Sequence, residues 1–451
     1  MNPTIISQFG SRKDFYPRLG LFLLLVLGVA GLFLLPFSLG GDGGTRYEFM
    51  DTLVHQLRIV PMKYSIIGPL FSLPLWLISL SLKDPSAIIS RYNLLIYAGS
   101  IFVLYQWLKN YFDRKFLITF LFILSFASMF PGNLINYYGE VFSAVFLTLG
   151  TVGLAIKKDR VGWACLLLAV LNTPALLIPF ALVVVYLTWE TRQISYLSLI
   201  PICIILMMIE SYLRTGSVLA GFQIYLNEDH GFKTVLPFSS KIGYSYPFVL
   251  GVLSILFSFG KGLIFFCPSL ILIGWVRKSI SNPVERKMLI LWFLIVLGLI
   301  LAYASWWAWY GGWYWGPRFF LFASLPASWI LARLIHSDRK SLSLSLVLPL
   351  FMTLALWIGV NGLVFQLDTL GVCQQHDNAL ESLCWYVPEF SPLIRPFITH
   401  NALLLKDWLI LIIFAGLWLY SMVPLGIDLF RQLKEVFHAN RSLLNFSNWR
   451  F

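Results

Sequence analysis

The sequence predicts an all-α integral membrane protein with about twelve transmembrane helices, and three observations support this fold class. Of the 451 residues, 58% are hydrophobic and only 12% are charged, whereas charged residues approach a quarter of a soluble domain. Apolar runs long enough to cross a bilayer recur along the chain. Basic residues gather in alternate connecting segments, as the positive-inside rule requires. The net charge of +12 therefore reports topology and gives no sign of a nucleic-acid partner.

We expect residues 1–451 to form a single transmembrane domain, in which several spans are short enough to be tilted or half-buried. The expected spans are 19–39, 92–108, 116–131, 141–156, 161–172, 174–189, 194–213, 263–276, 286–304, 319–334, 341–361 and 404–427. The apolar stretch 64–82 is ambiguous, because Gly68, Pro69 and Pro74 interrupt it. It is either a further span or a broken element in the membrane interface.

The positive-inside rule favours the second interpretation of 64–82. If this stretch does not cross, one side of the membrane holds 21 of the 33 Lys and Arg residues but 8 of the 21 acidic residues. Residues 1–18 and the tail 428–451 then lie in the cytoplasm. The long segments 40–91, 132–140, 214–262, 305–318 and 362–403 lie on the far side, where we expect juxtamembrane helices and loops to form the functional site.

The first far-side loop opens with Asp42 between two pairs of glycines, just before an expected interfacial helix at about 47–57. A helix N-terminus stabilises a nearby carboxylate, and a general base must be ionised. Asp42 is therefore a candidate base, although a solvated turn that ends the first span would have the same sequence.

Glu140 comes at the outer mouth of the fourth span, on the same side as Asp42. A lone Glu at a helix start is most often a capping residue. Two carboxylates that enter one cavity could instead orient an acceptor or share a divalent cation such as Mg²⁺ or Mn²⁺. None of the six His residues has a metal-ligand spacing, and no nucleotide-binding or serine-hydrolase motif is present.

Two cations on the far side are candidates for binding a lipid phosphate. Lys261 lies between two glycines, where the backbone amides and the ammonium together would suit an anion, unless the side chain only reaches to the headgroups. Arg318 is the only charged residue between Lys287 and Arg333 and ends a Trp-rich loop at a Gly-Pro turn. A guanidinium in an apolar rim needs an anionic partner.

The aromatic residues of these loops could form an ordinary interfacial belt. They could also offer flat surfaces to a sugar or a prenyl chain, and we expect five of them to line the substrate: Tyr47, Tyr138, Trp309, Trp313 and Trp315.

Cys373 and Cys384 fall in the last far-side loop, and we expect a disulfide between them. The other three cysteines, Cys165, Cys203 and Cys267, lie in apolar spans and are expected to be packing residues.

Taken together, these motifs resemble the GT-C superfamily of integral-membrane glycosyltransferases, which includes protein O-mannosyltransferases and the aminoarabinose transferases of lipid A. The resemblance rests on Asp42 and Arg46 in the first loop, the broken stretch that starts at Lys63, Glu140, the Gly-Lys-Gly-Leu at 260–263 and the Trp-rich segment that ends in Gly-Pro-Arg at Arg318. Gly43 stands where the family pattern has a second acid.

This resemblance implies an inverting transfer of a sugar from a polyprenyl-phosphate carrier to a lipid, glycan or protein outside the cytoplasm. Asp42 and Glu140 would be the catalytic carboxylates, and Asp42 would act as the general base. Arg318, Lys261, Arg46 and Lys63 would bind the donor phosphate. The expected location is the inner membrane of a bacterium. A polyprenyl-linked sugar flippase or transporter, and a polysaccharide polymerase or ligase, remain alternatives.

Overall fold

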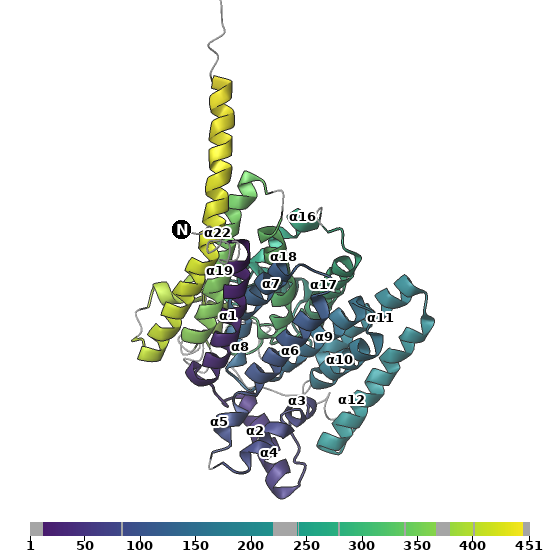
Figure 1. Cartoon of the computed structure of the whole chain (residues 1–451). Helices are drawn as coiled ribbons and strands as arrows, with labels where there is room; N and C mark the ends of the chain where they lie inside the picture. The colour runs from purple at the N-terminus through teal and green to yellow at the C-terminus, as the bar shows by residue number, and fades with distance from the viewer. Residues whose placement is uncertain are drawn as a thin grey trace, which may run out of the picture.

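The computed structural model describes residues 12–82, 84–219, 241, 243–277, 280–337, 340–366, 379–399 and 402–444. Regular structure in this part of the chain is helical, and extended backbone pairs at a single parallel bridge between Ser38 and Asn136. The expected all-α membrane fold is confirmed. Figure 1 shows the long helices packed side by side, with a group of shorter helices at one end.

Most of the expected spans are present as helices with similar bounds, except that the first helix begins and ends earlier than 19–39 and the last continues beyond 427. They are α1 (Arg12–Leu34), α6 (Tyr92–Leu108), α7 (Arg114–Phe126), α9 (Gly139–Ala155), α10 (Asp159–Asn172), α11 (Leu177–Thr191), α12 (Leu199–Thr215), α17 (Pro283–Tyr303), α18 (Ser324–Ile335), α19 (Leu342–Val364) and α22 (Leu405–Leu444). Within the described ranges, six helical stretches are both long and apolar enough to cross a membrane: 86–108, 174–191, 194–215, 318–335, 342–364 and 405–437.

Two expectations about the spans were wrong. The stretch 263–276 is not one helix but three short pieces, α15 (Leu263–Phe266), η4 (Pro268–Leu272) and α16 (Ile273–Val276), because Pro268 cannot continue the hydrogen-bond ladder of a preceding helix. The segment 214–262, expected to be a loop, contains the apolar helix α14 (Phe248–Phe257).

The ambiguous stretch 64–82 forms two short helices, α3 (Ile67–Leu70) and α4 (Leu73–Ser79), which are far too short to span a bilayer. Together with α2 (Asp42–Gln56) and α5 (Ser86–Ile89) they form the group at the bottom of Figure 1. Helix α2 begins at Asp42 itself, earlier than the expected start near residue 47. The juxtamembrane helices therefore form one layer at one end of the bundle.

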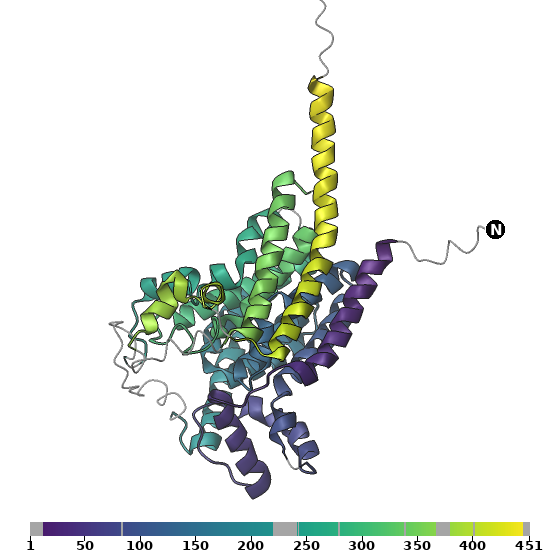
Figure 2. The same ribbon diagram turned by 90° about the vertical axis from the view of Figure 1, so that its left-hand side faces the viewer.

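The beginning of α1 and the end of α22 lie at the end of the bundle opposite α2–α5, and α22 extends well beyond the other helices (Figures 1 and 2). The two helices therefore place these ends at the same end of the bundle, and the cytoplasmic location of both stays a prediction.

Polar side chains connect the juxtamembrane layer to the bundle. The Asn172 side chain, at the end of α10, accepts a hydrogen bond from the Gly68 amide and donates one to the Gly139 carbonyl. Asn93 of α6 donates to the carbonyls of Asn136 and Tyr138. These bonds fix the backbone that leads into α9, and Glu140 lies in the first turn of that helix.

Close helix contacts depend on glycine at several places. A Cβ on Gly298 of α17 would overlap the backbone of Pro179 on α11, whereas a Cβ on Gly99 of α6 would have no atom within 4 Å. Small residues let helices approach closely in membranes, where packing drives association.

We therefore expect Gly298→Ala to lower the unfolding temperature in detergent, because overpacking costs about 1–3 kcal/mol. The matched control is Gly99→Ala, which should be neutral or slightly stabilising because Ala is the better helix former. Equal unfolding temperatures for the two variants would contradict this packing.

Candidate active site

Asp42 is the first residue of α2 and follows Gly41, whose φ of 58° is in the left-handed region that favours glycine. A Cβ on Gly41 would lie 2.7 Å from the Tyr138 hydroxyl oxygen. The chain leading to Asp42 is also tied to the segment before α9, since the Ser38 amide donates to the Ile135 carbonyl at 2.8 Å. Asp42 is thus placed beside the start of α9.

Arg318 joins two carboxylates from different parts of the chain. Its Nη1 lies 2.9 Å from Oδ2 of Asp42, and its Nε lies 3.4 Å from Oε1 of Glu140. The Nε also donates to the Gly311 carbonyl at 2.6 Å, which fixes the guanidinium relative to its own loop. The structure therefore brings together the three residues that the sequence singled out on three separate far-side segments.

Aromatic rings surround this guanidinium. The Arg318 Cζ lies 5.2 Å from the ring centroid of Tyr138, 5.6 Å from that of Tyr314 and 5.4 Å from that of Phe319. Ring faces attract cations, and they also exclude water from the ion pairs. Tyr138, one of the expected substrate-lining residues, is therefore part of the cluster.

The second oxygen of Asp42 is bound by Tyr64, whose hydroxyl donates to Oδ1 at 2.6 Å. Above the Tyr64 ring, at 4.5 Å from its centroid, lies the guanidinium of Arg46, which is only 7% exposed. Arg46 makes no ion pair within the described residues, and its Nε is buried without a hydrogen-bond partner there. Arg46 is therefore a second, incompletely satisfied cation beside Asp42.

These contacts decide the charge of Asp42. Burial alone favours the neutral acid, but Arg318, the Tyr64 hydroxyl and Arg46 outweigh it and hold the pKa of this carboxyl below its usual value. Burial and the Asp42 charge raise the pKa of Tyr64, which stays neutral and remains a hydrogen-bond donor. Asp42 is consequently ionised at neutral pH.

Glu140 lies in the first turn of α9 and keeps its Oε2 buried without a hydrogen-bond partner among the described residues. Among the described residues there is no group of three or more His, Cys, Asp or Glu that could hold a metal ion. Because Asp42 and Glu140 both bind Arg318, a guanidinium already supplies the positive charge between them. The pair as arranged does not fit a divalent cation.

Lys261 is not brought into the Asp42 cluster, so its expected place in the phosphate site is not supported. Its side chain is 1% exposed, and its ammonium donates to the carbonyls of Gly312, Tyr314 and Gly316. It also lies 4.8 Å from the Trp385 ring centroid. Through these hydrogen bonds Lys261 holds the glycine-rich loop before Arg318 against the helix bundle.

Several expected lining residues pack elsewhere. Trp309 and Trp315 are buried, and the Trp315 Nε1 donates to Asn361 Oδ1 at 2.6 Å. Tyr47 lies against Trp76, with 5.0 Å between ring centroids. Trp309 and Trp315 have structural roles because their aromatic-rich loop buries them in its own core, whereas Tyr47 of α2 packs against α4.

The remaining expected residues have mixed outcomes. Trp313 is half-buried, and Lys63 is half-buried next to Tyr64. Cys384 is disulfide-bonded, and its expected partner Cys373 lies outside the described residues. Cys165, Cys203 and Cys267 are buried free cysteines, as expected.

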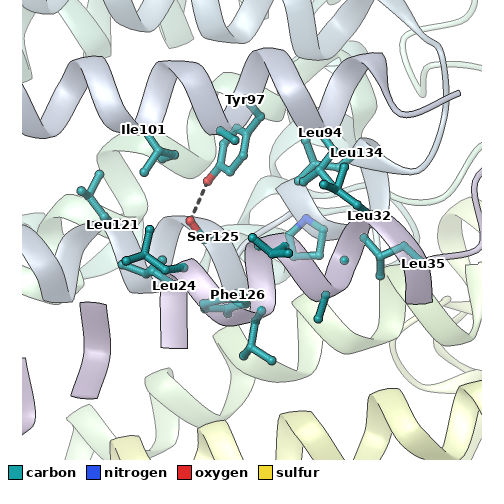
Figure 3. A pocket seen from close by; sticks show the side chains of 18 of the residues that line it. Leu24, Leu32, Leu35, Leu94, Tyr97, Ile101, Leu121, Ser125, Phe126 and Leu134 are labelled. Atoms are coloured by element: carbon teal, nitrogen blue, oxygen red, sulfur yellow. Dashed lines mark hydrogen bonds between the residues drawn. The ribbon is translucent and has the colours of Figure 1, made fainter. Parts of the chain in front are cut away.

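A large apolar cavity lies apart from the charged cluster, between α1, α6, α7, α19 and α22. Its volume is about 390 Å³, and Asp42, Glu140 and Arg318 do not line it. Figure 3 shows leucines of α1 and α6 facing this space, with the hydrogen bond between the Tyr97 and Ser125 hydroxyls, 3.2 Å long, beside it. Such a lining suits hydrocarbon and offers nothing to a charged group.

No protein-family model matches the sequence, and no curated protein matches it. Among solved structures, the chain is similar to ArnT from Cupriavidus metallidurans, whose crystal structure is bound to undecaprenyl phosphate. The sequences are 13% identical, the TM-score is 0.48, and the match covers 91% of this chain and 77% of that one. The function proposed below rests on the residues of the cluster.

The role of Lys261 leads to a testable expectation. Lys261→Met would leave the Tyr314 carbonyl without its donor and would take one of two donors from the Gly312 and Gly316 carbonyls, which keep the amides of Tyr314 and Arg318. A buried unsatisfied group costs about 1–3 kcal/mol. We expect a clear fall in the unfolding temperature in detergent. Lys158→Met removes a lysine whose ammonium lies 5.3 Å from the Trp107 ring centroid near an exposed helix start, and it should change little. A stable Lys261→Met protein would contradict the fastening role.

Proposed function

We propose that this protein is a membrane glycosyltransferase that moves a sugar from a polyprenyl-phosphate carrier to an acceptor hydroxyl, with inversion at the anomeric carbon. The observation that carries this proposal is the cluster in which Arg318 binds both Asp42 and Glu140, with Tyr64 and Arg46 beside Asp42. It combines an ionised carboxylate with two guanidinium groups, which are the groups that such a transfer needs.

The reaction breaks one bond and forms one. The acceptor oxygen attacks the anomeric carbon from the face opposite the phosphate, and the bond between that carbon and the phosphate oxygen breaks. Asp42 takes the proton of the acceptor hydroxyl, for which it must be ionised and within hydrogen-bond reach. The phosphate leaves with the bonding electron pair and remains on the carrier.

Arg318 and Arg46 would neutralise the charge that accumulates on the leaving phosphate. Arg318 is bound to Asp42 in the absence of the carrier. A phosphate that also binds the Arg318 guanidinium would weaken the ion pair between Arg318 and Asp42. Asp42 then becomes a stronger base once the donor is in place. Glu140, which also binds Arg318, would keep the guanidinium oriented.

The position of the cluster favours transfer over transport. Transporters place ionisable residues near the bilayer midplane at broken helices. Here Asp42 begins α2, in the layer of short helices at one end of the bundle (Figure 1). We place this end outside the cytoplasm of a bacterial inner membrane, with a lipid, glycan or protein of the cell envelope as acceptor. A divalent cation is not part of the proposal, because Arg318 occupies its place.

The direct test is a transfer assay on the purified protein in detergent, with radiolabelled polyprenyl-phosphate sugars and extracted membrane lipids. We expect the wild type to move label from the carrier and Asp42→Asn to lose at least 10²-fold of that rate, within the range for removal of a general base. Asp51→Asn is the control, since Asp51 lies on the same helix and is 47% exposed.

Half or more of the wild-type rate in Asp42→Asn would remove Asp42 from the base role. A wild type that binds the carrier phosphate but releases no label from any carrier would favour the transport alternative instead.

The assignment of Arg318 predicts a difference between two arginines. Arg318→Ala should weaken binding of undecaprenyl phosphate by about 2 kcal/mol or more, roughly 30-fold, as expected for a desolvated charge partner. Arg91→Ala should leave binding nearly unchanged, because Arg91 lies over Phe37 and donates to the Leu32 carbonyl. Equal losses in an equilibrium binding assay would count against the phosphate role of Arg318.

A further inference from the structure

Helix α12 carries a buried ion pair that the proposed reaction does not use. Glu210 and Arg214 are the only charged residues in Leu199–Thr215, and they are 7% and 3% exposed. The Nε of Arg214 lies 2.9 Å from Glu210 Oε1, and its Nη2 lies 3.3 Å from Oε2. The two side chains thus form a two-point pair one helical turn apart.

This pair forms hydrogen bonds with the backbone of the segment Met62–Ile66 on both sides of Tyr64. Arg214 Nη1 donates to the Met62 carbonyl at 2.6 Å and to the Lys63 carbonyl at 3.1 Å. Glu210 Oε1 accepts from the Ile66 amide at 3.0 Å. The backbone is therefore held just before and just after the residue whose hydroxyl reaches Asp42.

The rest of α12 is poorly suited to such a pair. Most residues of this helix are not buried inside the protein, and large side chains on it are exposed, among them Ile205, Ile209 and Tyr212. A buried ion pair is seldom more stabilising than apolar residues of similar size. Its contacts with Met62–Ile66 give this pair a purpose beyond stability.

We propose that Glu210 and Arg214 are positioning residues, which hold the segment Met62–Ile66 so that the Tyr64 hydroxyl stays on Asp42. This inference rests on the proposed function for the importance of Asp42 as a base. The effect on Asp42 itself is a property of the resting protein and is measurable without any transfer.

Four groups face Asp42: Arg46 of α2, Tyr64 of the held segment, Tyr138 just before α9, and Arg318 of η6 (Arg318–Ala323). Glu140 of α9 acts on Asp42 through Arg318, to which it also binds. Loss of Glu210 or Arg214 removes none of these charges. It releases only the Tyr64 hydroxyl, so Asp42 should be protonated at a higher pH than in the wild type.

The experiment measures protonation of Asp42 in the full chain in detergent. A carbodiimide with an amine nucleophile couples to protonated carboxyl groups, and mass spectrometry gives the labelled fraction of Asp42 at each pH. We expect the labelling midpoint of Arg214→Ala to move upward by as much as that of Tyr64→Phe. The double variant should show no further movement, because both changes remove one interaction.

Three further variants sharpen the result. Tyr212→Ala, on the same helix with an exposed side chain, should label as the wild type does. Arg214→Lys keeps a cation for Glu210 and should restore part of the wild-type midpoint. Glu210→Ala removes the acceptor of the Ile66 amide and the partner of Arg214, and it provides the test if Arg214→Ala does not fold.

An unchanged midpoint in Arg214→Ala or Glu210→Ala would overturn the positioning role, and so would a double variant in which the two shifts add. Absence of sugar transfer by the wild type would overturn the proposed function alone, because the labelling readout does not depend on transfer.

Discussion

The ion pairs of Arg318 are the interactions on which the rest of the proposed site depends. A guanidinium among aromatic rings is costly unless anions surround it, and here Asp42 and Glu140 supply them. The three residues come from α2, α9 and η6, which are far apart in the sequence. One cation therefore links the first juxtamembrane helix to the core of the bundle and sets the charge state of the candidate base.

The surrounding structure holds this arrangement in place. Lys261 fastens the glycine-rich loop behind Arg318, Asn172 and Asn93 fix the backbone before Glu140, and Glu210 with Arg214 holds the segment of Tyr64. Lys261, Asn172, Asn93 and Arg214 donate to backbone carbonyls, and Glu210 accepts from the Ile66 amide. Irregular backbone at membrane depth is tolerated where protein groups satisfy it, so these polar side chains allow broken helices to carry the site.

The sequence predicted the fold class, most of the spans and the three central residues, because hydropathy, charge asymmetry and an isolated arginine are local signals. It assigned Lys261 to a phosphate and Trp315 to a substrate, because residue type does not show whether an ammonium or a ring points into a site or into the loop's own core. Tyr64 and Arg214 had no local signal at all. The role of Arg214 follows from contacts across some 150 positions of the chain, and that of Tyr64 from its contact with Asp42, 22 positions away.

The separation of the charged cluster from the apolar cavity also has a physical reason. Charged groups need partners and backbone donors, which the ends of short helices provide, whereas the leucine-lined space between α1, α6 and α7 offers none. A carrier with a charged head and a hydrocarbon chain requires both kinds of surface in one membrane protein.

The most direct test of the central claim is the affinity of Asp42→Asn for undecaprenyl phosphate, measured at equilibrium beside the wild type. If Arg318 passes from Asp42 to the carrier phosphate, removing the carboxylate charge leaves the guanidinium free, and the variant should bind as tightly as the wild type or more tightly. A large loss of affinity in Asp42→Asn would contradict the account, because it would mean that the ion pair itself, and not the cation it holds, forms the binding site.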